Sequence, residues 1–248
     1  MKKFKMEVEV PYFACDKNGR MRLQSLLDYL AEASSAHSDA LGVGYKDLIS
    51  GNFGWVLNRW KLKIFDYPSG RDKIIIETWT SKVYKFYANR EFIIYNMAGE
   101  EIAKATSVWI FLNVERKRPS RIPEDIQNRY KMVDESIFED FYKFSDFKDV
   151  KDSKNFAIRR SDIDYNDHVN NVKYIEWIIE SIPESIFDKY SLVDLEILYK
   201  QEIQYGQEAI CQMDESNLSN DCIEYLHEIS TNDDSRINAY GKTKWKKL

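Results

Sequence analysis

The sequence predicts an α+β protein of two similar units in tandem, each with one long helix and an antiparallel sheet. Two observations support this class. In each half of the chain a helix-forming stretch is followed by a run of strand-forming stretches, which is the order of an α+β unit and not of alternating βαβ units. The halves also repeat at residue level, because Asp164 and Asn166 stand 148 positions after Asp16 and Asn18.

The first half reads as a strand, a helix and further strands. Residues 4–10 alternate apolar and polar side chains, which predicts a half-buried strand. From Leu23, apolar residues recur at helical spacing until Gly42 and Gly44 end the pattern. We therefore expect an N-terminal domain of residues 1–125. Its later strand-forming stretches are residues 55–65, 72–81, 85–96 and 101–113.

The second half shows the same order of elements. Residues 126–152, rich in charged and aromatic side chains, are assigned as a linker, and residues 153–248 as a C-terminal domain. The helix of this domain carries apolar residues at spacings of three and four up to Ile182, and Pro183 stops it. The strand-forming stretches are residues 192–206, 208–214, 222–230 and 236–247.

A row of polar residues precedes the second helix. Asp164, Asn166 and His168 stand at alternate positions, so an extended backbone would turn all three side chains to one face. At the helix N-terminus, free backbone N–H groups and the helix dipole favour negative charge, such as the oxyanion of an attacked acyl group. These residues therefore predict a hydrolytic site.

The first half lacks the imidazole of this row, because His168 falls on Arg20 in the repeat. Imidazole is the one group of the row that can move a proton near neutral pH, so we expect the chemistry in the second half. The aspartate and asparagine of both halves are also compatible with an Asx-type turn before the helix. Two other histidines, His37 on the polar side of the first helix and His227 in an alternating strand, are expected to be structural.

Composition and charge narrow the classes of function. The net charge of -5 at pH 7 disfavours nucleic acid as the main partner, because phosphate backbones are bound by basic faces. No signal-peptide pattern and no apolar run long enough to span a bilayer are found, so we expect a cytoplasmic protein. Cys15, Cys211 and Cys222 lack CxxC spacing and indicate reduced thiols. No metal and no cofactor are expected.

The stretch SDIDYNDHVNNVKYIEWIIESIP resembles the signature of the acyl-ACP thioesterases, enzymes that release fatty acids from acyl carrier protein (ACP). Segments of the first half, including NRWKLKIFDYPSGRDKIIIETWTS and ATSVWIFLNVERKRPSRIP, are similar to family segments too. The resemblance implies two tandem hotdog domains, in each of which a sheet wraps a helix. It also implies an acyl-chain pocket in the N-terminal domain, catalysis in the C-terminal domain and ACP carrying a fatty acyl chain as the partner.

The resemblance further implies a site of four residues. The catalytic row of the family corresponds to Asp164, Asn166 and His168, and its catalytic carboxylate to Glu202 in the segment YKQEI on the following strand. Plant members place a cysteine directly after that glutamate, but here the position is Ile203. Isoleucine has no nucleophilic atom, so a cysteine mechanism is excluded at that position.

Thioester hydrolysis needs an activated water and a site for the oxyanion, since the thiolate leaves with little help. We expect Glu202 and His168 to orient and deprotonate the water, and the proton acceptor is left open between them. Asn166 is expected to fix the water or the carbonyl by hydrogen bonding. Asp164 is expected to hold Asn166 and the local backbone.

Two further contacts with the substrate are expected. The backbone N–H groups of Val169 and Asn170, at the helix start, are expected to bind the oxyanion. The basic runs at residues 115–121 and in the C-terminal KTKWKK are candidates to steer the acidic ACP. Acyl-chain length, saturation and branching depend on packing in the pocket, so no residue is assigned to substrate binding.

Alternatives to acyl-ACP hydrolysis remain open at this point. An acyl-CoA thioesterase on the same fold differs only in the carrier. A hotdog enoyl hydratase or dehydratase carries D-x-N-x-x-H with proline after the asparagine, whereas DYNDH has its histidine one residue earlier and no proline. A non-catalytic acyl-binding regulator normally adds a helix-turn-helix, and no basic recognition helix is expected before residue 4 or after Gly241. The oligomeric state is open, with a homodimer among the options.

Overall fold

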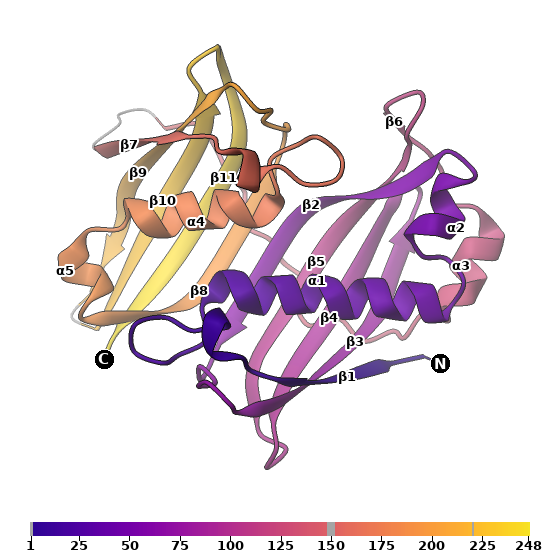
Figure 1. Cartoon of the computed structure of the whole chain (residues 1–248), viewed down its shortest axis with the longest axis horizontal. Helices are drawn as coiled ribbons and strands as arrows, with labels where there is room; N and C mark the ends of the chain where they lie inside the picture. The colour runs from indigo at the N-terminus through magenta and orange to yellow at the C-terminus, as the bar shows by residue number, and fades with distance from the viewer. Residues whose placement is uncertain (1, 148–151, 220) are drawn as a thin grey trace. The chain divides into compact units, whose positions relative to one another are not determined.

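The structure, a computed structural model of the chain, describes residues 2–147, 152–219 and 221–248. It divides into two compact units, unit 1 (Met1–Glu139) and unit 2 (Asp140–Leu248). In each unit a long helix lies across one face of an antiparallel sheet (Figure 1). The α+β class expected from the order of elements is confirmed. No described helix is both long and apolar enough to cross a membrane.

The strands of unit 1 follow the order β1-β3-β4-β5-β2, with the short β6 beside β5. The helix α1 turns Leu26, Leu27 and Leu30 into the core, as its apolar spacing predicts. The elements are β1 (Phe4–Glu9), η1 (Tyr12–Ala14), α1 (Leu23–Ala40), α2 (Tyr45–Ile49), β2 (Phe53–Ile64), β3 (Lys73–Tyr84), β4 (Tyr87–Asn96), β5 (Glu101–Asn113), β6 (Arg118–Pro119) and α3 (Glu124–Tyr130).

The strands of unit 2 follow the order β7-β9-β10-β11-β8, which is the order of unit 1 with each strand replaced by its counterpart. The helix α4 buries Tyr174, Ile175, Trp177 and Ile178. The elements are β7 (Asp152–Ala157), η2 (Arg160–Asp162), α4 (Asn171–Ser181), α5 (Glu184–Phe187), β8 (Tyr190–Tyr199), β9 (Glu208–Leu218), β10 (Cys222–Thr231) and β11 (Asp234–Lys247).

The repeat found in the sequence is present in the backbone of both units. The 3-10 turns η1 and η2 begin at Tyr12 and Arg160, and the long helices α1 and α4 begin at Leu23 and Asn171. Between each turn and its helix, an isolated bridge closes a loop; these bridges are Cys15–Met21 and Ile163–Val169. Every one of these pairs of positions differs by 148, so the residue-level repeat is confirmed.

One strand is shorter than the sequence predicts. A strand is expected over residues 192–206, but β8 ends at Tyr199. The next two backbone N–H groups both donate to one carbonyl, that of Asn238, and this shared acceptor ends the regular ladder. Glu202 therefore lies on a loop before β9 and not on a strand, which corrects the expected position of this residue.

Buried glutamates hold the segment that we assigned as a linker. α3 includes the first residues of this segment, and a described stretch without helix or strand follows. Backbone outside a helix or sheet needs other acceptors for its N–H groups. These N–H groups donate as follows: Ile137 to Glu91 at 3.1 Å, Tyr142 to Glu196 at 2.8 Å and Phe147 to Glu228 at 2.6 Å. Burial raises the pKa of Glu91 and of Glu228.

Both histidines expected to be structural are buried, each in its own unit. The expected position of His37 on the polar side of the first helix is wrong, because it lies on the buried face of α1 with its Nδ1 2.9 Å from Nη1 of Arg90. This guanidinium is the hydrogen-bond partner of Nδ1 in the core, and burial lowers the pKa of Arg90. His227 lies on β10 as expected, with its Nε2 3.0 Å from Oγ1 of Thr243.

Candidate active site

The polar row forms a tight loop between η2 and α4. Oδ1 of Asp164 accepts hydrogen bonds from the backbone N–H groups of Asn166 at 2.8 Å and His168 at 3.4 Å. The Asp164 N–H in turn donates to the His168 carbonyl at 2.8 Å. The Asx-type turn is therefore confirmed, and the expectation of an extended row is wrong. A short carboxylate that satisfies nearby N–H groups stabilises the turn in place of a strand.

The loop places His168 beside Glu202. Nε2 of His168 lies 2.9 Å from Oε2 of Glu202, and the two side chains are 27% and 56% exposed. The backbone is tied next to both residues, since the N–H of Val169 donates to the carbonyl of Ile203 at 2.9 Å. The structure thus brings together an imidazole and a carboxylate in a position that water can reach. Such a pair is able to take a proton from a bound water molecule.

Side chains from the helix and the sheet hold the loop that carries Glu202. The hydroxyl of Tyr174 on α4 donates to the carbonyl of Gln201 at 3.4 Å, and the side-chain amide of Asn238 on β11 donates to the carbonyl of Glu202 at 3.3 Å. Burial raises the pKa of Tyr174, which keeps its hydroxyl a donor. Ile203 is fully buried and anchors the loop by packing.

The side chains of Asn166 and Asp164 differ in whether they already make hydrogen bonds within the protein. Asn166 is exposed, and its side-chain amide has no hydrogen-bond partner among the residues that the structure describes. The Asp164 carboxylate already accepts hydrogen bonds from the loop backbone. The amide of Asn166 is therefore available to a ligand, whereas Asp164 shapes the loop.

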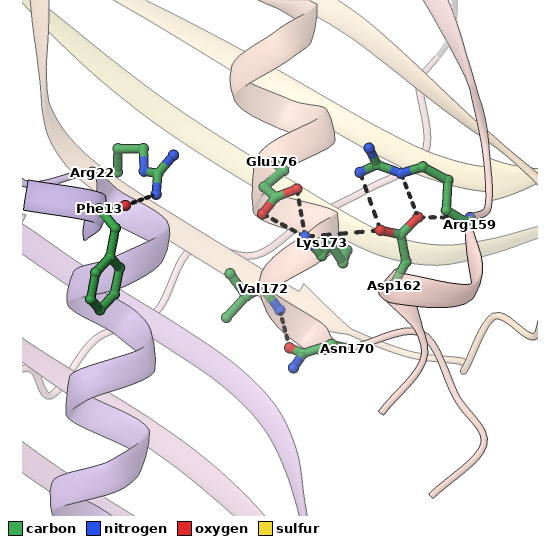
Figure 2. Close-up of polar contacts among 8 residues, drawn as sticks. All are labelled: Phe13, Arg22, Arg159, Asp162, Asn170, Val172, Lys173 and Glu176. Atoms are coloured by element: carbon green, nitrogen blue, oxygen red, sulfur yellow. Dashed lines mark hydrogen bonds and ion pairs between the residues drawn. The ribbon is translucent and has the colours of Figure 1, made fainter. Parts of the chain in front are cut away.

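The two N–H groups expected to bind an oxyanion already have acceptors. That of Val169 donates to the Glu202 loop, and that of Asn170 donates to the carbonyl of Asp162 at 2.8 Å. The expected binding of an oxyanion does not fit these two N–H groups, because their hydrogen bonds already close the base of the loop, here called its neck. The Asn170 side chain caps α4 by accepting from the N–H of Val172 at 2.9 Å (Figure 2). The N–H of Asn171, the first residue of α4, has no acceptor among the described residues.

Unit 1 contains a loop with the same backbone hydrogen bonds. Oδ1 of Asp16 accepts from the N–H groups of Asn18 at 2.8 Å and Arg20 at 3.0 Å. Gly19 has a φ of 78° where Asp167 of unit 2 has 61°, so both loops turn through the left-handed region. Glycine adopts this conformation without a steric cost, and aspartate is among the few other residues that tolerate it.

The side chains that differ between the two loops are those of the candidate site. In unit 1 the N–H of Met21 donates to the carbonyl of Pro68 at 2.8 Å, and in unit 2 the N–H of Val169 donates to the carbonyl of Ile203. Each donor directly follows the last residue of its loop, and each acceptor directly follows the residue that faces that loop. By this correspondence, unit 1 has Arg20 and Tyr67 at the positions of the imidazole and the carboxylate. Burial raises the pKa of Tyr67. The loop geometry is thus shared, and the imidazole–carboxylate pair is specific to unit 2.

No cluster of metal ligands is found among the described residues, and burial keeps the thiol of Cys211 protonated. No group of three or more His, Cys, Asp or Glu among them is placed to hold a metal ion. Cys15, Cys211 and Cys222 are free cysteines. Cys211 is fully buried, and burial raises the pKa of its thiol to about 12, so this thiol is not ionised near neutral pH.

Comparison with known proteins identifies the family. The family model described as the acyl-ACP thioesterase N-terminal domain matches residues 1–130, and the one described as the acyl-ACP thioesterase C-terminal domain matches residues 145–247. A chloroplastic palmitoyl-acyl carrier protein thioesterase of Gossypium hirsutum is 29% identical over 90% of this chain and 59% of its own length. The chain spans about three fifths of the length of such curated relatives.

Solved structures of similar proteins cover the whole chain. A Lactobacillus plantarum protein described as an oleoyl thioesterase is 25% identical with a TM-score of 0.91, covering 100% of this chain and 97% of its own. An acyl-ACP thioesterase of Bacteroides thetaiotaomicron is 25% identical with a TM-score of 0.87, covering 98% of each chain. The two units are therefore tandem hotdog domains, and the chain belongs to the acyl-ACP thioesterase family.

Proposed function

We propose that this chain hydrolyses the thioester of fatty acyl-ACP to free fatty acid and ACP, with water as the nucleophile. The observation that carries the proposal is the 2.9 Å contact between Nε2 of His168 and Oε2 of Glu202. It lies in the half of the chain that matches the C-terminal domain of acyl-ACP thioesterases. Two of the proteins named above, those of Gossypium hirsutum and Bacteroides thetaiotaomicron, are described as acyl carrier protein thioesterases and support the class of substrate.

The reaction follows from the chemistry of this pair. A water molecule held by His168 and Glu202 attacks the thioester carbonyl carbon, and the pair takes its proton as the C–O bond forms. The tetrahedral oxyanion then collapses, the C–S bond breaks and the thiolate of the carrier leaves. The proton held by the pair returns to that thiolate, so the site ends in its starting state.

The developing oxyanion needs hydrogen-bond donors that are not already used. The side-chain amide of Asn166 and the backbone N–H of Asn171 meet this condition among the described residues. We assign the carbonyl oxygen to these two groups in place of the N–H groups at the neck of the loop. The position of Asn171 at the start of α4 adds the positive end of the helix dipole.

Unit 1 is proposed to hold the acyl chain. It contains an apolar cluster made of Val43, Leu48, Ala88, Phe111, Ile122, Ile126 and Tyr130. Partly buried apolar side chains, including Leu41, Phe53 and Trp55, pack against this cluster. Apolar surroundings of this kind suit a hydrocarbon chain. The loop of unit 1 lacks the imidazole, which supports a binding role without chemistry.

A release assay with two carriers tests the proposed substrate. The same acyl group is offered on ACP and on CoA, over chain lengths from short to long, and kcat/KM is measured for each. We expect kcat/KM for acyl-ACP to exceed that for acyl-CoA at least about tenfold, a difference of about 1.4 kcal/mol in transition-state binding. Equal or faster turnover of acyl-CoA identifies the chain as an acyl-CoA thioesterase. Binding without turnover on either carrier identifies a non-catalytic acyl-binding protein.

Replacing all three cysteines is expected to leave most of the activity. The proposed nucleophile is water, and the position after Glu202 is the buried Ile203. The variant is Cys15→Ser, Cys211→Ala and Cys222→Ser, with alanine in the core because a buried hydroxyl costs stability. We expect at least half of the wild-type kcat and no loss of activity with a thiol-alkylating reagent. A folded variant without activity contradicts the water mechanism.

A further inference from the structure

We propose that Asp162, which lies outside the four expected site residues, is a positioning residue that holds the His168 loop on the first turns of α4. This inference rests on the proposed function. It comes from a polar cluster of Arg159, Asp162, Lys173 and Glu176, here called the Asp162 cluster, which lies at the neck of the loop (Figure 2). In unit 1 the positions of Arg159, Asp162 and Lys173 carry uncharged side chains.

The contacts of Asp162 join η2 to α4. The carboxylate accepts from the backbone N–H of Arg159 at 2.8 Å and from Nε and Nη2 of its guanidinium at 3.3 and 3.2 Å. Nζ of Lys173 on α4 lies 3.9 Å from Oδ1 of Asp162 and 2.8 Å from Oε1 of Glu176 (Figure 2). The Asp162 side chain is only 2% exposed. A buried carboxylate therefore ties the turn before the loop to the helix after it.

The twin loop keeps the same turn without a carboxylate, because Pro11, at the position of Arg159, has no N–H that needs an acceptor. Ala14 occupies the position of Asp162 in unit 1 and is equally buried. Its N–H donates to Pro11 at 2.9 Å and its carbonyl accepts from Arg22 at 2.9 Å, and Asp162 makes the corresponding backbone bonds in unit 2 at 3.0 and 2.8 Å. By the same repeat, Pro11 stands at the position of Arg159 and Ser25 at that of Lys173.

Accepting the Arg159 N–H does not by itself explain why the Asp162 carboxylate also faces Lys173 on α4, because taking a charge out of water is costly. The Asp162 carboxylate and the imidazole–carboxylate pair both occur in unit 2. Asp162 precedes Ile163, whose bridge to Val169 closes the loop next to His168. Restraining both sides of this neck restrains the His168 ring relative to Glu202. A misplacement of about 1 Å is enough to cost about a hundredfold in rate.

The test replaces Asp162 with alanine, the residue of the twin loop. The Arg159 side chain is 69% exposed and Lys173 keeps its ion pair with Glu176, so neither cation is left buried and alone. We expect the melting temperature to fall by no more than about 4 °C. We expect kcat for acyl-ACP to fall about tenfold to a hundredfold with KM within threefold. Asp162→Asn keeps the size and one acceptor oxygen, so its loss of kcat is expected to be smaller.

A second readout reports the position of the ring without reference to activity. The chain has three histidines, so the imidazole signals of histidine-labelled protein are few, and His168→Ala assigns those of His168. In Asp162→Ala we expect the His168 signals to broaden or split while those of the other two histidines stay sharp. Glu180→Ala, which removes an exposed carboxylate of α4 paired with Lys154 at 3.8 Å, is the control and is expected to change neither kcat nor the signals.

The outcomes separate this inference from the proposed function. Wild-type kcat or unchanged His168 signals in Asp162→Ala, with His168→Ala inactive, overturn the positioning role and leave the proposed function standing. Full activity of His168→Ala overturns the proposed function, and the signals of the ring then still test the positioning role. If Asp162→Ala does not fold, the same measurements on Asp162→Asn decide.

Discussion

His168→Ala and Glu202→Ala are each expected to lower kcat for acyl-ACP at least about a hundredfold, the usual scale for losing a general base. Each variant removes one partner of the 2.9 Å contact on which water activation depends. The double variant is expected to lose little more than either single one, because groups that act as a unit are not additive. Single-turnover release of fatty acid from acyl-ACP is the measurement.

These variants are expected to remain folded. The two side chains are 27% and 56% exposed, so their removal buries no unpaired charge. The backbone bond from Val169 to Ile203 does not involve either side chain. Glu184→Ala, at an exposed position of α5, controls for loss of a carboxylate in the same unit and is expected to keep wild-type kcat. A His168 or Glu202 variant that is folded and keeps more than a tenth of kcat contradicts the assignment.

Glu202→Gln distinguishes the two roles open to the carboxylate. Glutamine keeps a hydrogen-bonding oxygen near the ring but cannot accept a proton near neutral pH. If Glu202 is the base, the variant is as slow as Glu202→Ala. If Glu202 orients His168 and the ring is the base, the variant retains a measurable part of kcat. The comparison of the two variants at one pH assigns the proton acceptor.

Periodicity and internal repetition predicted the architecture because both can be read directly from the sequence. The leucines of α1 report the face that is buried, and alternation reports half-buried strands. The offset of 148 between Asp16 and Asp164 carried more information still. Comparing the two loops of the repeat separates the features that both units share from those that occur in one unit.

The same reasoning from periodicity failed where a particular hydrogen bond decides the local conformation or the burial of a side chain. The expected extended row is a turn because the Asp164 carboxylate captures two N–H groups. The N–H of Val169 is occupied by the carbonyl of Ile203, which is remote in sequence. His37 is buried because a guanidinium from β4 reaches it. Asp162 was missed because it lies in a single 3-10 turn without periodicity; alignment with Ala14 across the repeat is the signal that points to it.

Below pH 6.5 the free energy of unfolding is expected to depend strongly on His227. The ring is fully buried on β10, and burial lowers its pKa from 6.5 to about 3. Only Nε2 has a partner, Oγ1 of Thr243 at 3.0 Å, and Nδ1 has none among the described residues. The folded state therefore stays neutral, while the unfolded chain takes up a proton as pH falls through 6.5. Stability from this group is complete above pH 6.5 and is lost between pH 6.5 and 3.

His227→Gln removes this proton uptake and is expected to reduce the acid sensitivity of folding. Glutamine is neutral at every pH and can still hydrogen-bond to Thr243, whose Oγ1 also accepts from the indole N–H of Trp245 at 3.0 Å. Relative to the variant, the wild type is expected to lose about 1.4 kcal/mol of unfolding free energy per pH unit below 6.5, or about 2 kcal/mol by pH 5. Chemical denaturation at pH 7.5, 6 and 5 measures this loss of unfolding free energy.

Thr243→Val, which removes the partner but keeps the imidazole, is the control. It is expected to lower stability at each pH and to keep the wild-type slope of unfolding free energy against pH. Equal slopes for wild type and His227→Gln refute the buried neutral ring as the source of acid sensitivity.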